Sequence, residues 1–184
     1  MAMTTPLCNF GWKAPGFSLP DVGGKFWTPE SAKGPRGLLV MFICNHCPYV
    51  QAIAPRLAQE AVELEKIGIG AIAVMSNDYD RYPEDSPEKM RLFAQTHGFA
   101  FPYVVDESQE TARAYDAVCT PDFFGFNAGL ELQYRGRLDS SGRDPAPPDA
   151  RRDLFLAMKQ VAETGHGPQD QVASMGCSIK WRET

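Results

Sequence analysis

The chain has 184 residues, of which 43% are hydrophobic and 22% are charged, an ordinary globular composition. This length favours one domain, residues 1–184, with a full hydrophobic core. The net charge is −5, from 18 basic and 23 acidic side chains, and there is no basic run. We therefore expect neither a nucleic-acid partner nor binding to an anionic membrane.

Two further features of the sequence bear on its compartment. No run approaches the ~18 apolar residues that a membrane-spanning helix needs. Residues 1–8 lack the basic and apolar regions of a signal peptide. We therefore expect a cytoplasmic protein, in which the five cysteines are catalytic or packed thiols rather than a disulfide scaffold.

The first half of the chain alternates strand and helix patterns. Two short alternating runs around a glycine pair predict an N-terminal β-hairpin over 14–27. The continuous apolar run 37–43 is typical of a strand that is buried on both faces. A helical apolar period follows as far as residue 67, and 69–75 is a second buried strand.

The second half continues the alternation. Ser86 is expected to cap a helix that begins at Pro87 and ends at Gly98. Further patterns predict a strand over 101–105, a helix over 108–118, a strand pair over 122–134, a helix ending at Gly165, and a tail over 166–184 that packs back on the domain. This order predicts an α/β fold with a central mixed sheet, helices on both faces and an antiparallel edge.

Two cysteines follow the first buried strand, Cys44 and Cys47, in the spacing of a redox-active pair. Thiol–disulfide exchange needs a reachable thiolate, and we expect the helix to begin at Cys44 and to favour its ionised form. Cys44 is then the nucleophile and Cys47, one turn inside the helix, the resolving thiol. A zinc site is the alternative, although structural zinc usually takes four ligands, and two packed cysteines are another.

His46 lies between the two cysteines. If it is protonated and close to the Cys44 sulfur, it stabilises the thiolate and makes the disulfide a stronger oxidant. The alternative is a solvent-exposed imidazole with little effect on the pair.

Several fragments of this sequence resemble the thioredoxin-like superfamily, in its peroxiredoxin-like or redoxin branch (alkyl hydroperoxide reductase and thiol-specific antioxidant). They occur in the family's order and span nearly the whole chain: 14–21, 44–48, 119–124, 134–139 and 174–181. The resemblance implies a thioredoxin-like fold with a redoxin-type strand–helix insertion at 101–118. It also implies that Pro121 is cis and faces the cysteine pair, which would leave the Thr120 backbone free to pair with an extended substrate.

The chain departs from two patterns of that superfamily. Asn45 and His46 stand where thioredoxin carries Gly-Pro. Peroxiredoxins carry Pro-x-x-x-Thr/Ser-x-x-Cys, and counting back from Cys47 gives Cys44 and Val40 at the Thr/Ser and Pro positions. Counting back from Cys44 fails as well. We therefore expect a thiol–disulfide oxidoreductase, with a thiol-dependent peroxidase or a non-enzymatic zinc-binding or redox-sensing module as alternatives.

Other residues complete the expected site. Cys119 and Cys177 are possible extra redox thiols, although a packed side chain is favoured for each. Arg135 and Arg137 are expected on an exposed strand face. No nucleotide-binding loop is present in the sequence, so no cofactor is implied. The expected partners are a protein or small-molecule disulfide or thiol and an electron donor.

Overall fold

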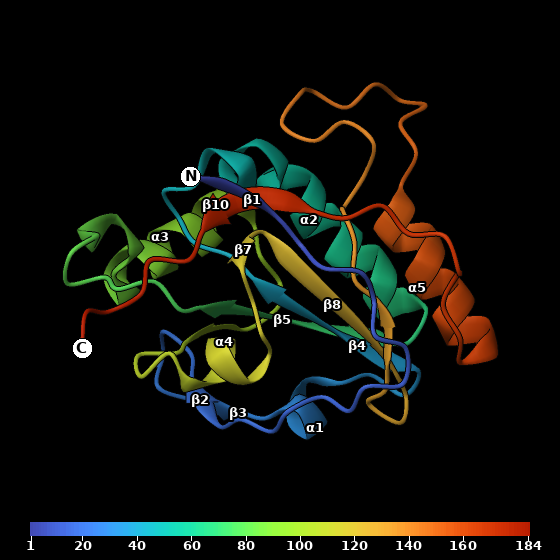
Figure 1. Cartoon of the computed structure of the whole chain (residues 1–184), viewed down its shortest axis with the longest axis horizontal. Helices are drawn as coiled ribbons and strands as arrows, with labels where there is room; N and C mark the ends of the chain where they lie inside the picture. Colours follow the sequence, from blue (N-terminus) through green and yellow to red (C-terminus); the bar gives the residue numbers. More distant parts are fainter.

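A central sheet runs through the computed structural model, which describes residues 1–184 (Figure 1). The middle strand, β4 (Gly37–Phe42), pairs antiparallel with β8 (Asp122–Asn127) on one side. On the other side the backbone N–H of Ile43 donates to the Val74 carbonyl at 3.1 Å. The strands are, in spatial order, β6 (Tyr103–Val105), β5 (Ile69–Met75), β4 (Gly37–Phe42), β8 (Asp122–Asn127) and β9 (Leu132–Tyr134). The β5–β6 pair is parallel and the β4–β8–β9 pairs are antiparallel, which confirms the predicted mixed sheet.

The middle strand β4 is buried on both faces, which explains its uninterrupted apolar sequence. Successive side chains of a strand point to opposite faces. Leu39, Met41 and Ile43 join the larger hydrophobic core, whereas Leu38 and Val40 join the smaller one.

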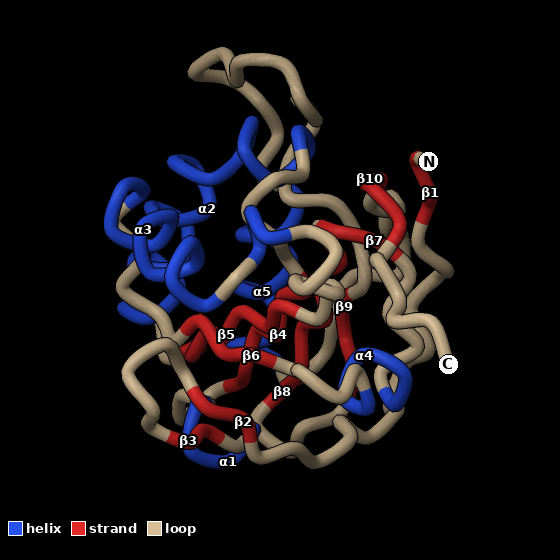
Figure 2. Tube along the Cα trace, turned by 90° about the vertical axis from the view of Figure 1, so that its left-hand side faces the viewer, coloured by secondary structure: helices blue, strands red, loops and turns tan.

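Helices cover both faces of the sheet (Figure 2). The larger core lies under three helices, which contribute Leu57, Met90 and Leu154. The smaller core lies under a short helix and the N-terminal segment, which contribute Ala112 and Trp12. The helices are α2 (Pro48–Lys66), α3 (Pro87–His97) and α5 (Asp153–Thr164) on the first face, and α1 (Pro29–Ala32) and α4 (Glu110–Ala114) on the second. None of these helices has the length and hydrophobicity that crossing a membrane requires.

Local sequence signals predicted most element boundaries correctly. The expected N-terminal hairpin is present as β2 (Leu19–Pro20) and β3 (Phe26–Trp27). Ser86 caps α3, accepting the Lys89 backbone N–H at 3.4 Å. The helix expected over 108–118 is shorter, because the left-handed residue Asp116 (φ 52°) follows its last turn.

Both ends of the chain meet in a second, small sheet. The N-terminal strand β1 (Ala2–Thr4) pairs antiparallel with β10 (Met175–Ser178), and β10 pairs antiparallel with β7 (Cys119–Thr120). Figure 1 shows β1, β10 and β7 side by side at one end of the molecule. The tail over 166–184 thus reaches the strand that carries Thr120.

The expectation that Arg135 is exposed is wrong. Arg135 follows β9 and is buried, with its guanidinium 2.9 Å from Asp122 Oδ2 and 4.4 Å above the Phe124 ring. Asp122 is fully buried at the start of β8. Removing either partner of such a buried ion pair destabilises the fold, because the remaining charge is left buried with neither a partner nor solvent.

We expect Asp122→Ala to lower the free energy of unfolding by about 3–5 kcal/mol, since it leaves Arg135 charged and buried. Urea unfolding followed by circular dichroism measures this loss. The matched control is Glu183→Ala, which breaks the exposed pair with Arg81 and is expected to change stability by less than about 0.5 kcal/mol. Equal effects of the two variants would contradict a structural role for the buried pair.

Candidate active site

Cys44 and Cys47 lie in the connection between β4 and α2, and the helix begins later than we expected. It starts at Pro48, with Cys47 as its N-cap residue, so the expectation that Cys47 lies one turn inside is wrong. The two backbone N–H groups between the cysteines donate to Asp85 Oδ1, at 2.8 and 3.2 Å, instead of opening the helix. The positive end of the helix dipole therefore lies at Cys47 rather than at Cys44.

Cys44 is only 1% exposed, and its Sγ lies 3.5 Å from Thr120 Oγ1. Its pKa is raised well above the ordinary value, first because its S–H donates to the Cys47 sulfur, then because the thiol is buried and Asp85 is near. In the reduced protein Cys44 therefore holds its proton.

Cys47 is fully buried, yet its pKa is lowered. The main cause is the hydrogen bond from the Cys44 thiol; burial opposes it, and donors from Cys177 and Thr120 add to it. The Thr120 carbonyl, 3.2 Å from the Cys47 sulfur, favours the protonated thiol because it can only accept. The donors and the helix N-terminus outweigh that contact, so the thiolate is favoured at Cys47, opposite to our assignment from the sequence.

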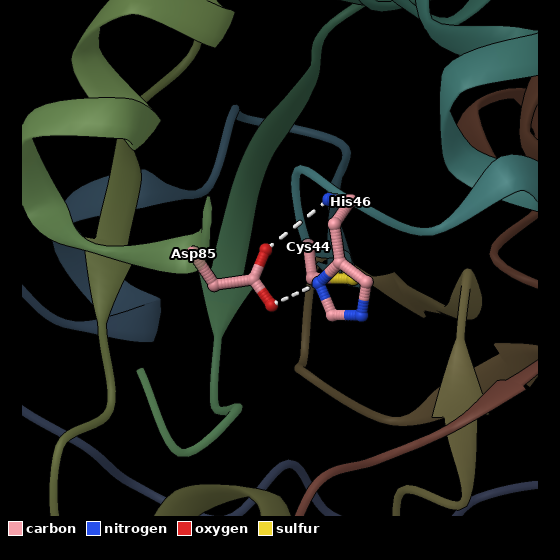
Figure 3. Close-up of side chains that lie close together, drawn as sticks. All are labelled: Cys44, His46 and Asp85. Carbon is pink, nitrogen blue, oxygen red and sulfur yellow. Dashed lines mark hydrogen bonds and ion pairs between the residues drawn. The ribbon is translucent and has the colours of Figure 1, made fainter. Parts of the chain in front are cut away.

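His46 is paired with a carboxylate that lies 39 residues further along the chain (Figure 3). Its Nδ1 is 2.6 Å from Asp85 Oδ2, its side chain is 27% exposed, and its ring stacks on Tyr82. The hydrogen bond to Asp85 raises the pKa of His46, although burial opposes it. A ring nitrogen of His46 and the sulfur of Cys44 lie within 4.8 Å of each other, so an imidazolium would stabilise negative charge on that sulfur.

Asn45 holds the same loop from its other side. The side chain is buried, donates to the Glu84 carbonyl at 2.9 Å and accepts the Tyr103 hydroxyl at 2.9 Å. The backbone carbonyl of Asn45 accepts a hydrogen bond from the side-chain amide of Gln51. Asn45 is thus a positioning residue, and both polar atoms of its side chain have a hydrogen-bond partner.

The peptide bond between Thr120 and Pro121 is cis, as the resemblance implied. Thr120 contacts both cysteines, through Oγ1 and through its carbonyl. The expectation that its backbone is free for an added substrate strand is wrong, because Thr120 pairs with Cys177 of β10. The chain's own tail fills that position.

The two candidate extra thiols differ in their surroundings. Cys119 is fully buried in β7, its S–H lies 3.6 Å from the Pro121 carbonyl, and burial raises its pKa. Cys177 is half-buried on β10, pairs with Thr120 and packs against the core cluster that contains both cysteines of the pair. Only Cys177 therefore joins the pair.

Asp85 is the residue of this site that sequence reasoning missed. It is fully buried at the end of the short 3₁₀ helix η1 (Pro83–Asp85), in the segment between β5 and α3. Asn77 also donates to it, at 2.9 Å. One signal was available in the sequence. The polar residues that follow the buried strand 69–75 were expected at the same edge of the sheet as the cysteines that follow the strand 37–43.

Cys44, His46 and Asp85 are also the one group of side chains that could hold a metal ion. The set offers three ligands, one fewer than a structural zinc site uses. Asp85 Oδ2 is already bonded to His46 Nδ1 and to Asn77. The geometry therefore fits a charge-paired thiol site better than a closed metal site.

A cavity of about 490 Å³ lies beside the site. Its wall includes Tyr49 and Ile53 of α2, Pro121, Met175 of β10 and the loop 137–144. No cysteine lines it, so the cavity reaches the cis proline but not the sulfurs.

Comparison with protein families places the site in context. The model of the AhpC/TSA family matches residues 10–137, which include Cys44, Cys47 and Pro121. The chain belongs to the AhpC/TSA family. A redox function follows for this AhpC/TSA protein, as does the expected thioredoxin-like redoxin relationship.

Known proteins similar to this AhpC/TSA chain agree with the assignment. A Mycobacterium tuberculosis protein that carries the name "Putative peroxiredoxin" is 25% identical over 166 residues, 90% of this chain and 94% of its own. A structure of an uncharacterized conserved protein from Geobacillus kaustophilus is 40% identical, with a TM-score of 0.93 over 100% of this chain and 98% of that one. A secreted disulfide oxidoreductase from Mycobacterium tuberculosis, 16% identical, has a TM-score of 0.57 over 80% and 95% of the chains and confirms the thioredoxin-like fold.

We expect His46 to titrate above its ordinary pKa, and His97, whose pKa burial lowers, to titrate below it. A raised folded-state pKa means that the His46–Asp85 pair stabilises the fold fully below the pKa of unfolded histidine. That stabilisation is lost as the pH rises through the folded-state value. Asp85→Asn should lower the pKa of His46 and leave His97 unchanged, as measured by the NMR shifts of the ring protons. An unchanged His46 in the variant would contradict the pairing.

Proposed function

We propose that this protein is a thiol–disulfide oxidoreductase that cycles Cys44 and Cys47 between a dithiol and a disulfide. One observation carries the proposal: two buried thiols both contact Thr120, Cys44 at its hydroxyl and Cys47 at its carbonyl, next to the cis Pro121. Their opposite pKa shifts give the pair one thiolate and one thiol, the state from which exchange begins. Membership of a redox family supports the same activity.

The geometry supports a division of roles. The Cys47 thiolate attacks a disulfide sulfur of the substrate, and the substrate's other sulfur leaves as a thiolate. Cys44 then gives up its proton to that leaving group and attacks the Cys47 sulfur, which releases the reduced substrate. His46, kept charged by Asp85, stabilises the negative charge that develops on Cys44 during the second step.

We expect Cys47→Ser to lose dithiothreitol-driven insulin reduction entirely, because the favoured thiolate is gone. Cys44→Ser should turn over more slowly than the wild type, because the buried pair can no longer close its own disulfide. Cys119→Ser is the matched control: it changes a buried thiol whose hydrogen bond goes to the Pro121 carbonyl, and its rate should stay within about twofold of the wild type. Full activity of Cys44→Ser and Cys47→Ser together with loss in Cys119→Ser would contradict the proposal.

A second candidate is a thiol-dependent peroxidase. A lowered pKa at Cys47 and the name of the Mycobacterium tuberculosis relative favour it. A hydroperoxide would oxidise Cys47 to a sulfenic acid, and Cys44 would condense with it to form the disulfide and water. Against it, Cys44 and Val40 occupy the Thr/Ser and Pro positions of the peroxidase pattern.

Peroxide consumption separates the two candidates. Hydrogen peroxide is added to the wild type or to Cys47→Ser in the presence of dithiothreitol. If the protein exchanges disulfides but is not a peroxidase, the two proteins should consume peroxide at the same rate. A rate that depends on Cys47 and saturates with peroxide would instead favour the peroxidase. For the exchange activity we propose a protein or small-molecule disulfide as substrate, and in either case a dithiol as the electron donor.

A further inference from the structure

The tail strand β10 passes directly across the redox site. Its Cys177 is paired with Thr120, the residue whose carbonyl lies 3.2 Å from the Cys47 sulfur. The approach is closer than a side chain would allow: a Cβ on Gly176 would lie 1.9 Å from the Thr120 carbonyl oxygen. β10 lies between β1 and β7 at this end of the molecule (Figure 2).

Cys177 also contacts the pair through its own thiol. Cys177 packs against the core cluster that contains Cys44 and Cys47, and its thiol and backbone N–H lower the pKa of Cys47. The start of α2 and β10 meet again at Tyr49, whose hydroxyl lies 3.8 Å from Met175 Sδ. Cys44 and Cys47 are 1% and 0% exposed, whereas Cys177 is half-buried. Of the three clustered sulfurs, therefore, Cys177 is the one that solvent reaches most.

The tail is fixed in this position from both sides. Ala2 of β1 pairs with Cys177 on its outer edge. Before the strand, Ser174 Oγ donates to the Pro121 carbonyl at 2.9 Å. After it, the Lys180 backbone N–H donates to Asn77 Oδ1 at 2.9 Å. An external substrate strand would have to break all of these interactions to reach Thr120, so a redox route that leaves β10 in place requires much less rearrangement.

We infer that Cys177 is a third redox thiol of this protein, which exchanges with the Cys44–Cys47 disulfide to form a Cys47–Cys177 disulfide and so connects the buried pair to an external dithiol. This inference deepens the proposed function and rests on it.

The relay balances as two exchange steps. The Cys177 sulfur attacks the Cys47 sulfur, the Cys44–Cys47 bond breaks, and Cys44 leaves and takes up the proton that Cys177 released. No electrons are gained or lost in this step. An external dithiol then attacks Cys177, Cys47 leaves as a thiolate, and the second thiol of the donor displaces Cys177. The donor is oxidised to its disulfide and the protein gains two electrons.

The charges around Cys177 suit this order of events. In the reduced protein, burial and the hydrogen bond to the Cys47 sulfur raise the pKa of Cys177, so it stays a thiol. Once Cys47 is in a disulfide, that sulfur carries no negative charge. The positive charges of Lys180 and the N-terminal amine then lower the pKa of Cys177 with no opposing charge on Cys47, and both favour the Cys177 thiolate.

Trypsin digestion distinguishes the possible disulfides cleanly. Cys44 and Cys47 share the peptide 37–56, Cys177 lies in 160–180, and Cys8 and Cys119 lie in two other peptides. The Cys44→Ser variant is oxidised with oxidised glutathione, alkylated and mapped by mass spectrometry. We expect peptides 37–56 and 160–180 to be joined.

The matched control is Cys47→Ser, which keeps Cys44 and Cys177 and is expected to join these peptides at least about tenfold more slowly, because β10 contacts Cys47. Gly176→Ala, which forces β10 away with every thiol retained, should lower the yield of the joined peptides; Gly16→Ala, where a Cβ meets nothing within 4 Å, should not. Cys177 that remains free in oxidised Cys44→Ser would overturn the inference.

A second measurement separates this inference from the proposed function. Rapid-quench alkylation follows the reduction of the Cys44–Cys47 disulfide by dithiothreitol in the wild type and in Cys177→Ser. We expect the variant to be reduced about tenfold more slowly. Equal rates would overturn the relay and leave the proposed function standing. Failure of peptide 37–56 to form its internal disulfide in either protein would overturn the proposed function itself.

Discussion

The buried carboxylate of Asp85 is the interaction on which the redox site depends. It is 0% exposed and accepts both backbone N–H groups between the cysteines, the Nδ1 of His46 and the side chain of Asn77. Because these donors compensate its charge, the pKa of Asp85 is lowered even though burial alone would raise it. The carboxylate keeps residues 45 and 46 out of the helix, so the helix N-terminus faces Cys47 rather than Cys44.

A second constraint acts from the opposite side of the pair. The tail strand β10 and the N-terminal strand β1 close over Thr120, so the site is assembled from the start, the middle and the end of the chain. In a thiol site open to solvent, the substrate would approach the cysteines directly. Here the sulfurs of Cys44 and Cys47 are covered by the protein itself, and we infer from this cover that the half-buried Cys177 relays electrons to them.

The sequence was sufficient for much of this structure. The apolar run 37–43, the cysteine pair, the Ser86 cap and the Thr120-Pro121 dipeptide are local patterns, and each appeared where expected. The ionisation of the pair was not predictable in this way. It depends on Asp85 and Cys177, which lie 41 and 133 residues from Cys44, and on the Asp85 hydrogen bonds that delay the start of α2. Arg135 was misplaced for the same reason, because its partner Asp122 belongs to another strand.

The reduction potential of the Cys44–Cys47 pair tests the central claim most directly. It is measured by equilibrating Cys177→Ser with dithiothreitol or glutathione buffers and quantifying the disulfide inside peptide 37–56. A site that stabilises one thiolate stabilises the reduced form, so we expect a reversible two-electron transition at a potential less negative than the about −270 mV of thioredoxin. Two thiols that remain free at every buffer ratio would contradict the account.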